Sequence, residues 1–168
     1  EKTLAFSDAW SQKVSYGLDH SQTSITSWFG GADTPVNRFS LPFVPKKYFP
    51  DSRDTTNAIF LQSEIRNDRW IVTPGIRWEQ FAIDVASQDG YGQKATPLTG
   101  AQWTPKLGAL YKLQDDVSLF GNFATGFRAP NATQLNGFSE LTTSGYASYL
   151  SNPGLKPETS KNIELGLR

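Results

Sequence analysis

Side chains that could bind a metal ion or form a covalent intermediate are few in this sequence. Cysteine is absent and His20 is the single histidine, which excludes a thiolate site and a centre built from several histidines. Any metal ligand must therefore come from His20, a tyrosine or a carboxylate. The sequence contains no nucleophile motif, no glycine-rich phosphate loop and no distinct pair of carboxylates, so we expect no enzymatic activity.

The composition suits half-polar β-strands. The 168 residues carry 16 basic and 16 acidic side chains, and a net charge of zero gives no general attraction for nucleic acid. Aromatic residues make up 13% of the chain although its mean hydropathy is negative. No apolar run is long enough for a membrane-spanning helix. Because methionine and a signal peptide are both absent, we expect a piece of a longer protein.

Apolar and polar residues alternate most clearly between Trp70 and Trp78. One face of this predicted strand carries Trp70, Val72, Pro74, Ile76 and Trp78, and the other carries Thr73, Gly75, Arg77 and Glu79. The polar face suits a hydrated lumen, and a tryptophan at each end matches the two aromatic girdles of an outer-membrane barrel. A sheet that packs one face on a soluble core would show the same alternation.

The same alternation predicts further strands near residues 14–18, 57–65, 103–113 and 162–168, and a first strand is counted near residues 1–6. Short polar turns at 66–69 and 114–116 alternate with long loops near 30–55, 84–101 and 127–159. This sorting is typical of bacterial outer-membrane barrels, whose long loops face outside. We therefore predict an all-β fold of six to seven antiparallel up-and-down strands, forming part of a larger transmembrane β-barrel with neighbouring strands on either side.

Two segments resemble the strand and loop boundaries of TonB-dependent outer-membrane receptors. They are SLFGNFATGFRAP, from Ser118 to Pro130, and NPGLKPETS, from Asn152 to Ser160. Tyr48-Phe49-Pro50-Asp51 and the stretch from Val72 to Glu79 are also similar to the family. The resemblance implies that residues 1–168 are one segment of a barrel of about 22 strands in the bacterial outer membrane, without the plug domain. It further implies a gated transporter whose partners are the lipid bilayer and, through the plug, the TonB energy-transducing complex.

Within that family, a Phe-Arg-Ala-Pro entrance with an Asn-Pro-x-Leu exit resembles the receptors for haem and haemoproteins. Haem would then be the transported ligand, and no cofactor of the protein's own is expected. The loop of such receptors usually supplies a histidine to haem iron, but residues 131–151 contain none. Tyr149 and Tyr146 are the candidate ligands in its place, because a phenolate binds ferric haem. The full set of expected ligand-binding residues is Phe127, Arg128, Phe138, Tyr146, Tyr149 and Asn152.

Each of these roles has a simpler alternative. The two tyrosines could be surface or membrane-interface anchors, and Phe127 and Phe138 could bury the loop against itself instead of covering a porphyrin. Arg128 could pair with a propionate or with a carboxylate of the lumen. His20 continues an outward-facing row and is expected to point outward near the end of the apolar band.

Other functions also remain open for the chain as a whole. The missing loop histidine favours a receptor for a ferric siderophore or cobalamin. A non-gated porin or adhesin barrel has the same strand pattern. A soluble β-sandwich could bind carbohydrate through Trp70, Trp78 and Trp103.

Overall fold

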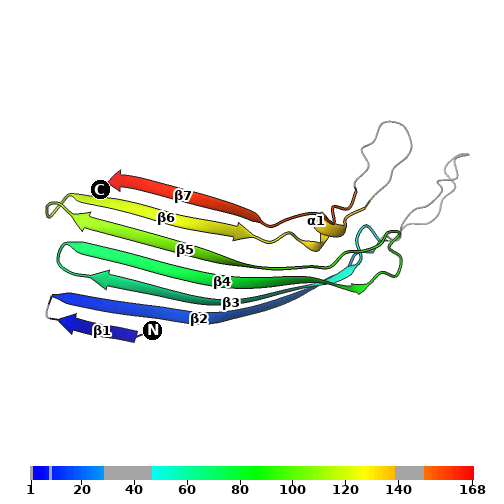
Figure 1. The fold of residues 1–168 in the computed structure, drawn as a ribbon, viewed down its shortest axis with the longest axis horizontal. Coiled ribbons are helices and arrows are strands. Elements are labelled where there is room, and N and C mark those ends of the chain that lie inside the picture. The colour runs from blue at the N-terminus through cyan, green and yellow to red at the C-terminus, as the bar shows by residue number, and fades with distance from the viewer. Residues whose placement is uncertain (1, 8, 29–46, 139–149) are drawn as a thin grey trace, which may run out of the picture.

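The computed structural model describes residues 2–7, 9–28, 47–138 and 150–168, with side chains from residue 9 onward. Seven strands and one short helix follow in chain order: β1 Lys2–Ser7, β2 Trp10–Ile25, β3 Asp51–Arg66, β4 Trp70–Ser87, β5 Leu98–Lys112, β6 Ser118–Arg128, α1 Ala132–Asn136 and β7 Glu158–Leu167. All the strands form one sheet in sequence order, and each pairs antiparallel with its neighbours (Figure 1). The predicted all-β, up-and-down architecture is confirmed.

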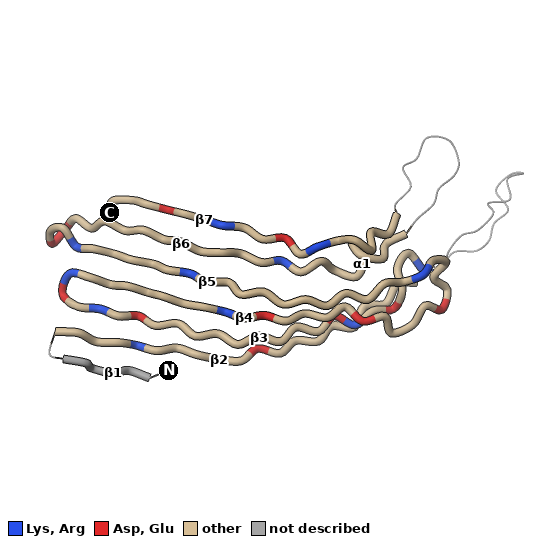
Figure 2. Tube along the Cα trace, in the orientation of Figure 1, with Lys and Arg blue, Asp and Glu red and all other residues tan. Residues whose placement is uncertain are grey.

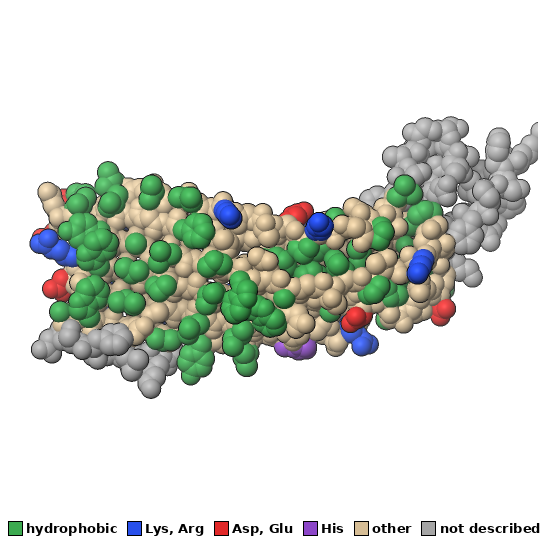
Figure 3. Space-filling view, viewed as in Figure 1, with side chains coloured by type: hydrophobic (Ala, Val, Ile, Leu, Met, Phe, Trp, Pro, Cys, Tyr) green, Lys and Arg blue, Asp and Glu red, His purple; other side chains and the backbone are tan. Residues whose placement is uncertain are grey.

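One face of the sheet, which we call the outer face, exposes a continuous belt of large apolar side chains (Figure 3). The belt comprises Tyr16, Leu18, Ile59, Leu61, Trp70, Ile76, Trp103, Leu107, Leu119, Phe123, Ile163, Leu165 and Leu167. An exposed apolar surface of this extent is stable only against lipid or another apolar partner. The belt is therefore the lipid-facing surface that the alternation predicted.

Two rows of paired aromatic rings bound this belt. Trp70 lies opposite Tyr111 in register with ring centroids 4.5 Å apart, and Trp78 lies opposite Trp103 at 6.4 Å. Eight residue steps of about 3.3 Å, tilted by roughly 40°, place the two rows on the order of 20 Å apart along the membrane normal. That height matches the apolar band of an outer-membrane barrel.

The opposite face, which we call the inner face, is polar between the two aromatic rows. Arg77 forms ion pairs there with Asp19 of β2 and with Glu79, the latter at 3.0 Å. Asp19 of β2 and Glu79 of β4 both lie opposite Ala58 of β3, one on each side of it. The ion pairs of Arg77 therefore link β2 to β4 across β3. Along the tube of Figure 2, charged residues are sparse in the middle of the strands and gather toward both ends.

The two ends of the sheet differ in the length of their connections. At one end β3 and β4 are joined by a tight turn in which the Asn67 side chain accepts hydrogen bonds from the backbone of Arg69 and Trp70. A second short turn joins β5 to β6, where the Leu113 amide donates to Val117. The strand ends that lead into the long connections all lie at the opposite end (Figure 1). The predicted alternation of short turns and long loops is confirmed.

The boundaries predicted for two of the long loops, 30–55 and 84–101, are wrong. β3 begins at Asp51, β4 runs on to Ser87 and β5 begins at Leu98, so these strands continue past Trp78 and Trp103. Beyond that aromatic row the outer face meets water, and polar residues such as Thr55 and Gln80 replace the apolar ones. The alternation that marks a strand in lipid therefore fades while the strand itself continues.

Glycines of the inner face pair directly with aromatic side chains of the adjacent strand. Gly17 lies opposite Phe60, Gly100 opposite Phe81 and Gly166 opposite Phe120. In each pair the phenylalanine ring covers the glycine so closely that an added Cβ would lie 2.5 or 2.6 Å from a ring atom. Such pairs recover contact area that glycine alone would lose in a strand.

Candidate ligand-binding site at the loop end of the sheet

The helix α1 packs onto the inner face at the loop end of the sheet. Ala132 and Leu135 are fully buried against Phe81 and Ile83 of β4. Ile25, Leu98, Phe127, Ala129 and Leu155 close the sides of this cluster. Phe81 and Ile83 alternate with the outward-facing Trp78, Gln80 and Ala82, so the helix lies on the lumen side of the sheet.

The sequence did not lead us to expect this helix, although a signal for it is present. Asn131 caps the helix: its side chain accepts from the Gln134 amide at 2.8 Å, and the Gln134 side chain accepts from the Asn131 amide at 3.1 Å. This reciprocal pair is a capping box, for which Asn followed three residues later by Gln is the sequence signature. The five helical residues are too few to show a 3.6-residue periodicity.

The last residue of α1, Asn136, joins two loops. Its side chain is 1% exposed, donates to the Thr96 carbonyl at 2.9 Å and accepts from the Thr96 amide at 2.8 Å. Its own carbonyl accepts a hydrogen bond of 2.6 Å from the Tyr91 hydroxyl. Burial raises the pKa of Tyr91, which keeps this hydroxyl protonated as a donor.

A third connection joins the same junction through residues 47–50. The Lys47 amide donates to Gly90 at 3.1 Å, and the Phe138 amide donates to the Tyr48 carbonyl at 2.7 Å. The buried Lys47 ammonium pairs with Asp51 at 2.6 Å. We call residues 47–51, 88–97 and 129–138 the loop junction, because hydrogen bonds tie all three segments together.

The structure places the predicted ligand-binding residues in different surroundings. Phe127 packs against Phe81 with ring centroids 5.8 Å apart. Phe138 is 7% exposed and packs with Tyr91 and Ala95. Both phenylalanines thus bury the loop against the sheet, which is the simpler of their two expected roles. Tyr146 and Tyr149 lie outside the described residues.

The two polar residues of that set lie beside α1. Arg128 forms an exposed ion pair with Glu158 across β6 and β7 at 3.3 Å, and the Asn152 amide donates to the Leu135 carbonyl at 2.9 Å. Arg128 and Glu158 also line a hollow of about 20 Å³ with Ala129, Pro130, Gln134, Leu155 and Lys156. A space of that size holds about one water molecule and no organic ligand.

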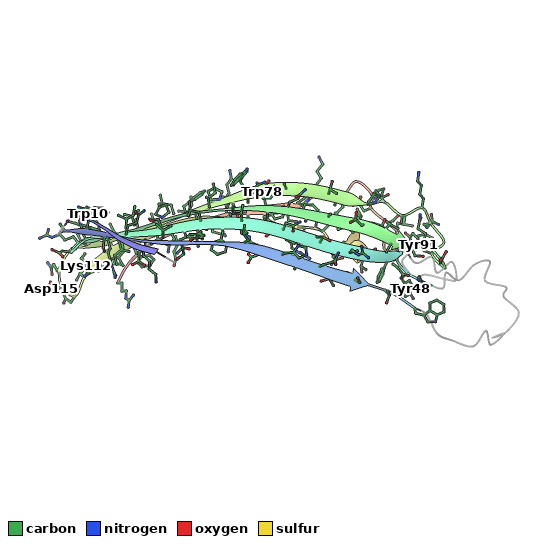
Figure 4. All side chains as sticks on the ribbon, turned by 90° about the horizontal axis from the view of Figure 1, so that it is seen from below. Trp10, Tyr48, Trp78, Tyr91, Lys112 and Asp115 are labelled. Atoms are coloured by element: carbon green, nitrogen blue, oxygen red, sulfur yellow. The ribbon has the colours of Figure 1, made fainter. Side chains whose placement is uncertain are left out.

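Exposed aromatic side chains missed by the sequence analysis lie at this same end of the sheet. Trp28 is 73% exposed and Tyr48 is 38% exposed. The Lys47 ammonium lies 5.9 Å from the centre of the Trp28 ring, within the range of a cation–π contact. Figure 4 places Tyr48 and Tyr91 together at the loop end, far from Trp10, Lys112 and Asp115 at the turn end.

The only histidine has a structural partner. Nδ1 of His20 lies 2.7 Å from Oδ1 of Asn57 on the outer face, just beyond the apolar belt, where the sequence placed it. Within residues 2–7, 9–28, 47–138 and 150–168, no three His, Cys, Asp or Glu side chains are grouped closely enough to hold a metal ion. In the same part of the chain no helix is long and apolar enough to cross a membrane.

The belt, the polar inner face and the sorted loops agree with comparison to known proteins. The family model described as "TonB dependent receptor-like, beta-barrel" matches residues 2–168. The chain belongs to this family. A TonB-dependent receptor barrel lies in the bacterial outer membrane, and the family consists of receptors and transporters, not enzymes. A soluble carbohydrate-binding sandwich is therefore wrong for this chain, as is a barrel outside this receptor family.

Several curated TonB-dependent receptors are similar in sequence. The ferrienterobactin receptor of Escherichia coli is 27% identical over 99% of this chain, the vitamin B12 transporter BtuB of Photobacterium profundum 31% over 72%, and the hemin receptor of Yersinia pestis 28% over 70%. These alignments cover 21%, 16% and 18% of the three relatives. The chain therefore spans about a fifth of the length of such receptors.

One solved structure shares the fold. A double mutant of the Serratia marcescens hemophore receptor HasR, in complex with its hemophore HasA and heme, superposes with a TM-score of 0.74 at 13% identity. The match covers 98% of this chain and 27% of that receptor. At this identity the similarity establishes the barrel fold of the TonB-dependent receptor segment and nothing about its ligand.

Proposed function

We propose that this segment belongs to a receptor that imports a ferric complex across the outer membrane, and that its loop end contributes to capture of that complex. The observation that carries the proposal is the loop junction. Tyr91 and Thr96 of one connection form three hydrogen bonds of 2.6 to 2.9 Å with Asn136 of another, at the end opposite the short turns. Lys47 and Tyr48 of a third connection bond to Gly90 and Phe138 at 3.1 and 2.7 Å. A preformed surface of this kind binds with little loss of conformational entropy.

Haem is the ligand that the sequence motif indicates. The argument rests on the Phe127-Arg128-Ala129-Pro130 entrance, the Asn152-Pro153 exit and the two loop tyrosines, Tyr146 and Tyr149, as ligands for ferric haem. Arg128 is largely exposed and its pairing with Glu158 is open to solvent, so exchange of Glu158 for a propionate is chemically reasonable. A haemoprotein that delivers haem would be the outside partner, and the TonB complex would supply energy through the plug.

A ferric siderophore is the second candidate, and one observation favours it. Phe127 and Phe138, the aromatic residues expected against a porphyrin, are instead packed against Phe81 and Tyr91. The exposed aromatic residues at this end are Trp28 and Tyr48, among the residues the structure describes there. Aromatic rings on an open surface suit a catecholate complex as well as they suit haem.

A pair of titrations separates these candidates. The full-length receptor in detergent is titrated with ferric haem and with ferric enterobactin, while the Soret and charge-transfer bands and the tryptophan fluorescence are recorded. A haem receptor shows a saturable phenolate-to-iron band that is lost in either Tyr146→Phe or Tyr149→Phe. Saturable quenching by ferric enterobactin without any haem response selects the siderophore. Absence of a saturable response to both probes overturns the proposal.

A further inference from the structure

We propose that α1 is a fixed part of the wall of the transport passage, which narrows the lumen at its loop end and leaves Thr133 facing the passage. This inference rests on the proposed function, because it needs a ligand that travels through the barrel. It assigns a size-limiting role to a helix that the ligand-binding motif does not include.

The first step is the height and side of the helix. Its buried residues contact Phe81 and Ile83, which share the inner face with Arg77 and Glu79. Phe81 is three residues beyond Trp78 on β4, which places the contact roughly 8 Å beyond the second aromatic row along the membrane normal. The helix thus lies on the lumen side of the sheet just beyond the second aromatic row, against strands that continue past it to Ser87.

The second step is that α1 is held along its buried side and at its C-terminal end. Asn131 and Gln134 cap its first turn, Asn136 bonds to Thr96, and the Leu135 carbonyl accepts from Asn152. Withdrawal of the helix from the lumen would break the hydrogen bonds to Thr96 and Asn152 and expose the buried Leu135. A ligand therefore has to pass the helix where it stands.

The third step concerns the side of α1 that faces away from the sheet. Ala132, Leu135 and Asn136 form the buried side, and Gln134 folds back to cap the helix. Thr133 is the exposed residue of α1, so its side chain lies on the side of the helix that faces away from the sheet. A larger group at this position would narrow the passage further without entering the packed cluster.

The test introduces a single cysteine into this segment, which has none of its own, and compares each variant with wild-type receptor treated with the same label. Thr133→Cys in the full-length receptor is labelled with a bulky membrane-impermeant maleimide, and uptake and binding of ⁵⁹Fe-enterobactin and ⁵⁹Fe-haem are compared before and after labelling. The matched control is Thr99→Cys. Thr99 is an exposed residue of β5 whose side chain lies on the outer face. It stands at the same height as the helix contact, because the next residue, Gly100, is the register partner of Phe81.

We expect the label at position 133 to lower the uptake rate at least about tenfold while binding from outside remains saturable, because pore width limits passage. The label at position 99 should leave uptake unchanged. Uptake by the labelled Thr133→Cys receptor at the unlabelled rate overturns the inference. Failure of the Thr133→Cys variant to react with maleimide, where the Thr99→Cys variant does react, overturns it as well. If wild-type receptor imports neither probe, the proposed function fails, while maleimide reactivity still tests whether Thr133 faces the open lumen.

Discussion

The side-chain amide of Asn136 bonds to both backbone polar groups of Thr96, at 2.8 Å and 2.9 Å, and so satisfies a loop residue that has no partner strand. We expect Asn136→Ala to destabilise the loop junction by about 1–3 kcal/mol, because the Thr96 groups would be left unpaired in a poorly hydrated place. Hydrogen exchange of the Thr96 amide should accelerate accordingly. Asn152→Ala is the control, because the side chain of Asn152 is exposed and its hydrogen bond to Leu135 is made by the backbone. Equal exchange rates in the two variants would contradict the assignment.

The loop junction should become less stable at alkaline pH, because Tyr91 loses the proton that it donates. Burial raises the pKa of this hydroxyl above its usual value near 10, so the folded state holds the proton more tightly than the unfolded state. Stability is therefore fully present below the unfolded pKa and falls as pH rises from there through the folded pKa. A difference titration of tyrosinate absorbance, wild type minus Tyr91→Phe, should show a tyrosine that ionises above the ordinary range. A difference curve centred on the ordinary value would rule out this linkage.

The outer belt predicts that the stability of the barrel depends strongly on which face of the sheet receives an added charge. Leu107 lies midway between Trp103 and Tyr111 on the outer face of β5, and we expect Leu107→Arg to cost about 2–4 kcal/mol of barrel stability. Thr104→Arg places the same charge on the inner face, where Lys106 is tolerated, and should cost much less. The free energy of unfolding of the full-length barrel in lipid measures both. Similar losses for the two variants would mean that the faces are assigned wrongly.

A substitution at Gly100 tests whether the Phe81 ring supports α1. An added Cβ at this position would lie 2.6 Å from the Phe81 ring, so Gly100→Ala must displace that ring and disturb the cluster that holds Leu135. We expect a loss of about 1–3 kcal/mol, typical of overpacking. Gly154→Ala is the control, because its Cβ would meet only Asn152 Oδ1 at 3.7 Å. Thermal unfolding should separate the variants, and identical midpoints would argue against close packing at Gly100.

The lipid-facing part of the fold could be predicted because lipid enforces a simple rule on sequence. Every second residue from Trp70 to Trp78 must be compatible with hydrocarbon or its interface, and this requirement appears directly as alternation. The rule ends at the second aromatic row. Beyond it, the continuation of β3 from Asp51 and of β4 to Ser87 could not be recognised, because water accepts polar residues on the outer face.

The candidate site was predictable only in its location. The boundaries of the loop between β6 and β7 were found to within two residues, from the prolines and the family resemblance. The contacts that shape it join residues far apart, such as Tyr91 and Asn136, which are separated by 45 positions. No local pattern encodes such a pair. The roles of Tyr146, Tyr149 and Asn152 in binding stay predictions.

β4 continues for nine residues past Trp78, and β3 is paired with it over this length. This continuation determines the shape that the segment presents on the outside of the cell. Cross-strand hydrogen bonds keep these two projecting strand ends in one shape, whereas most surface loops vary in conformation. The ridge formed by Asp51–Asn57 and Gln80–Ser87 therefore presents a fixed contour to the outside, and the loops beyond it start from a rigid base.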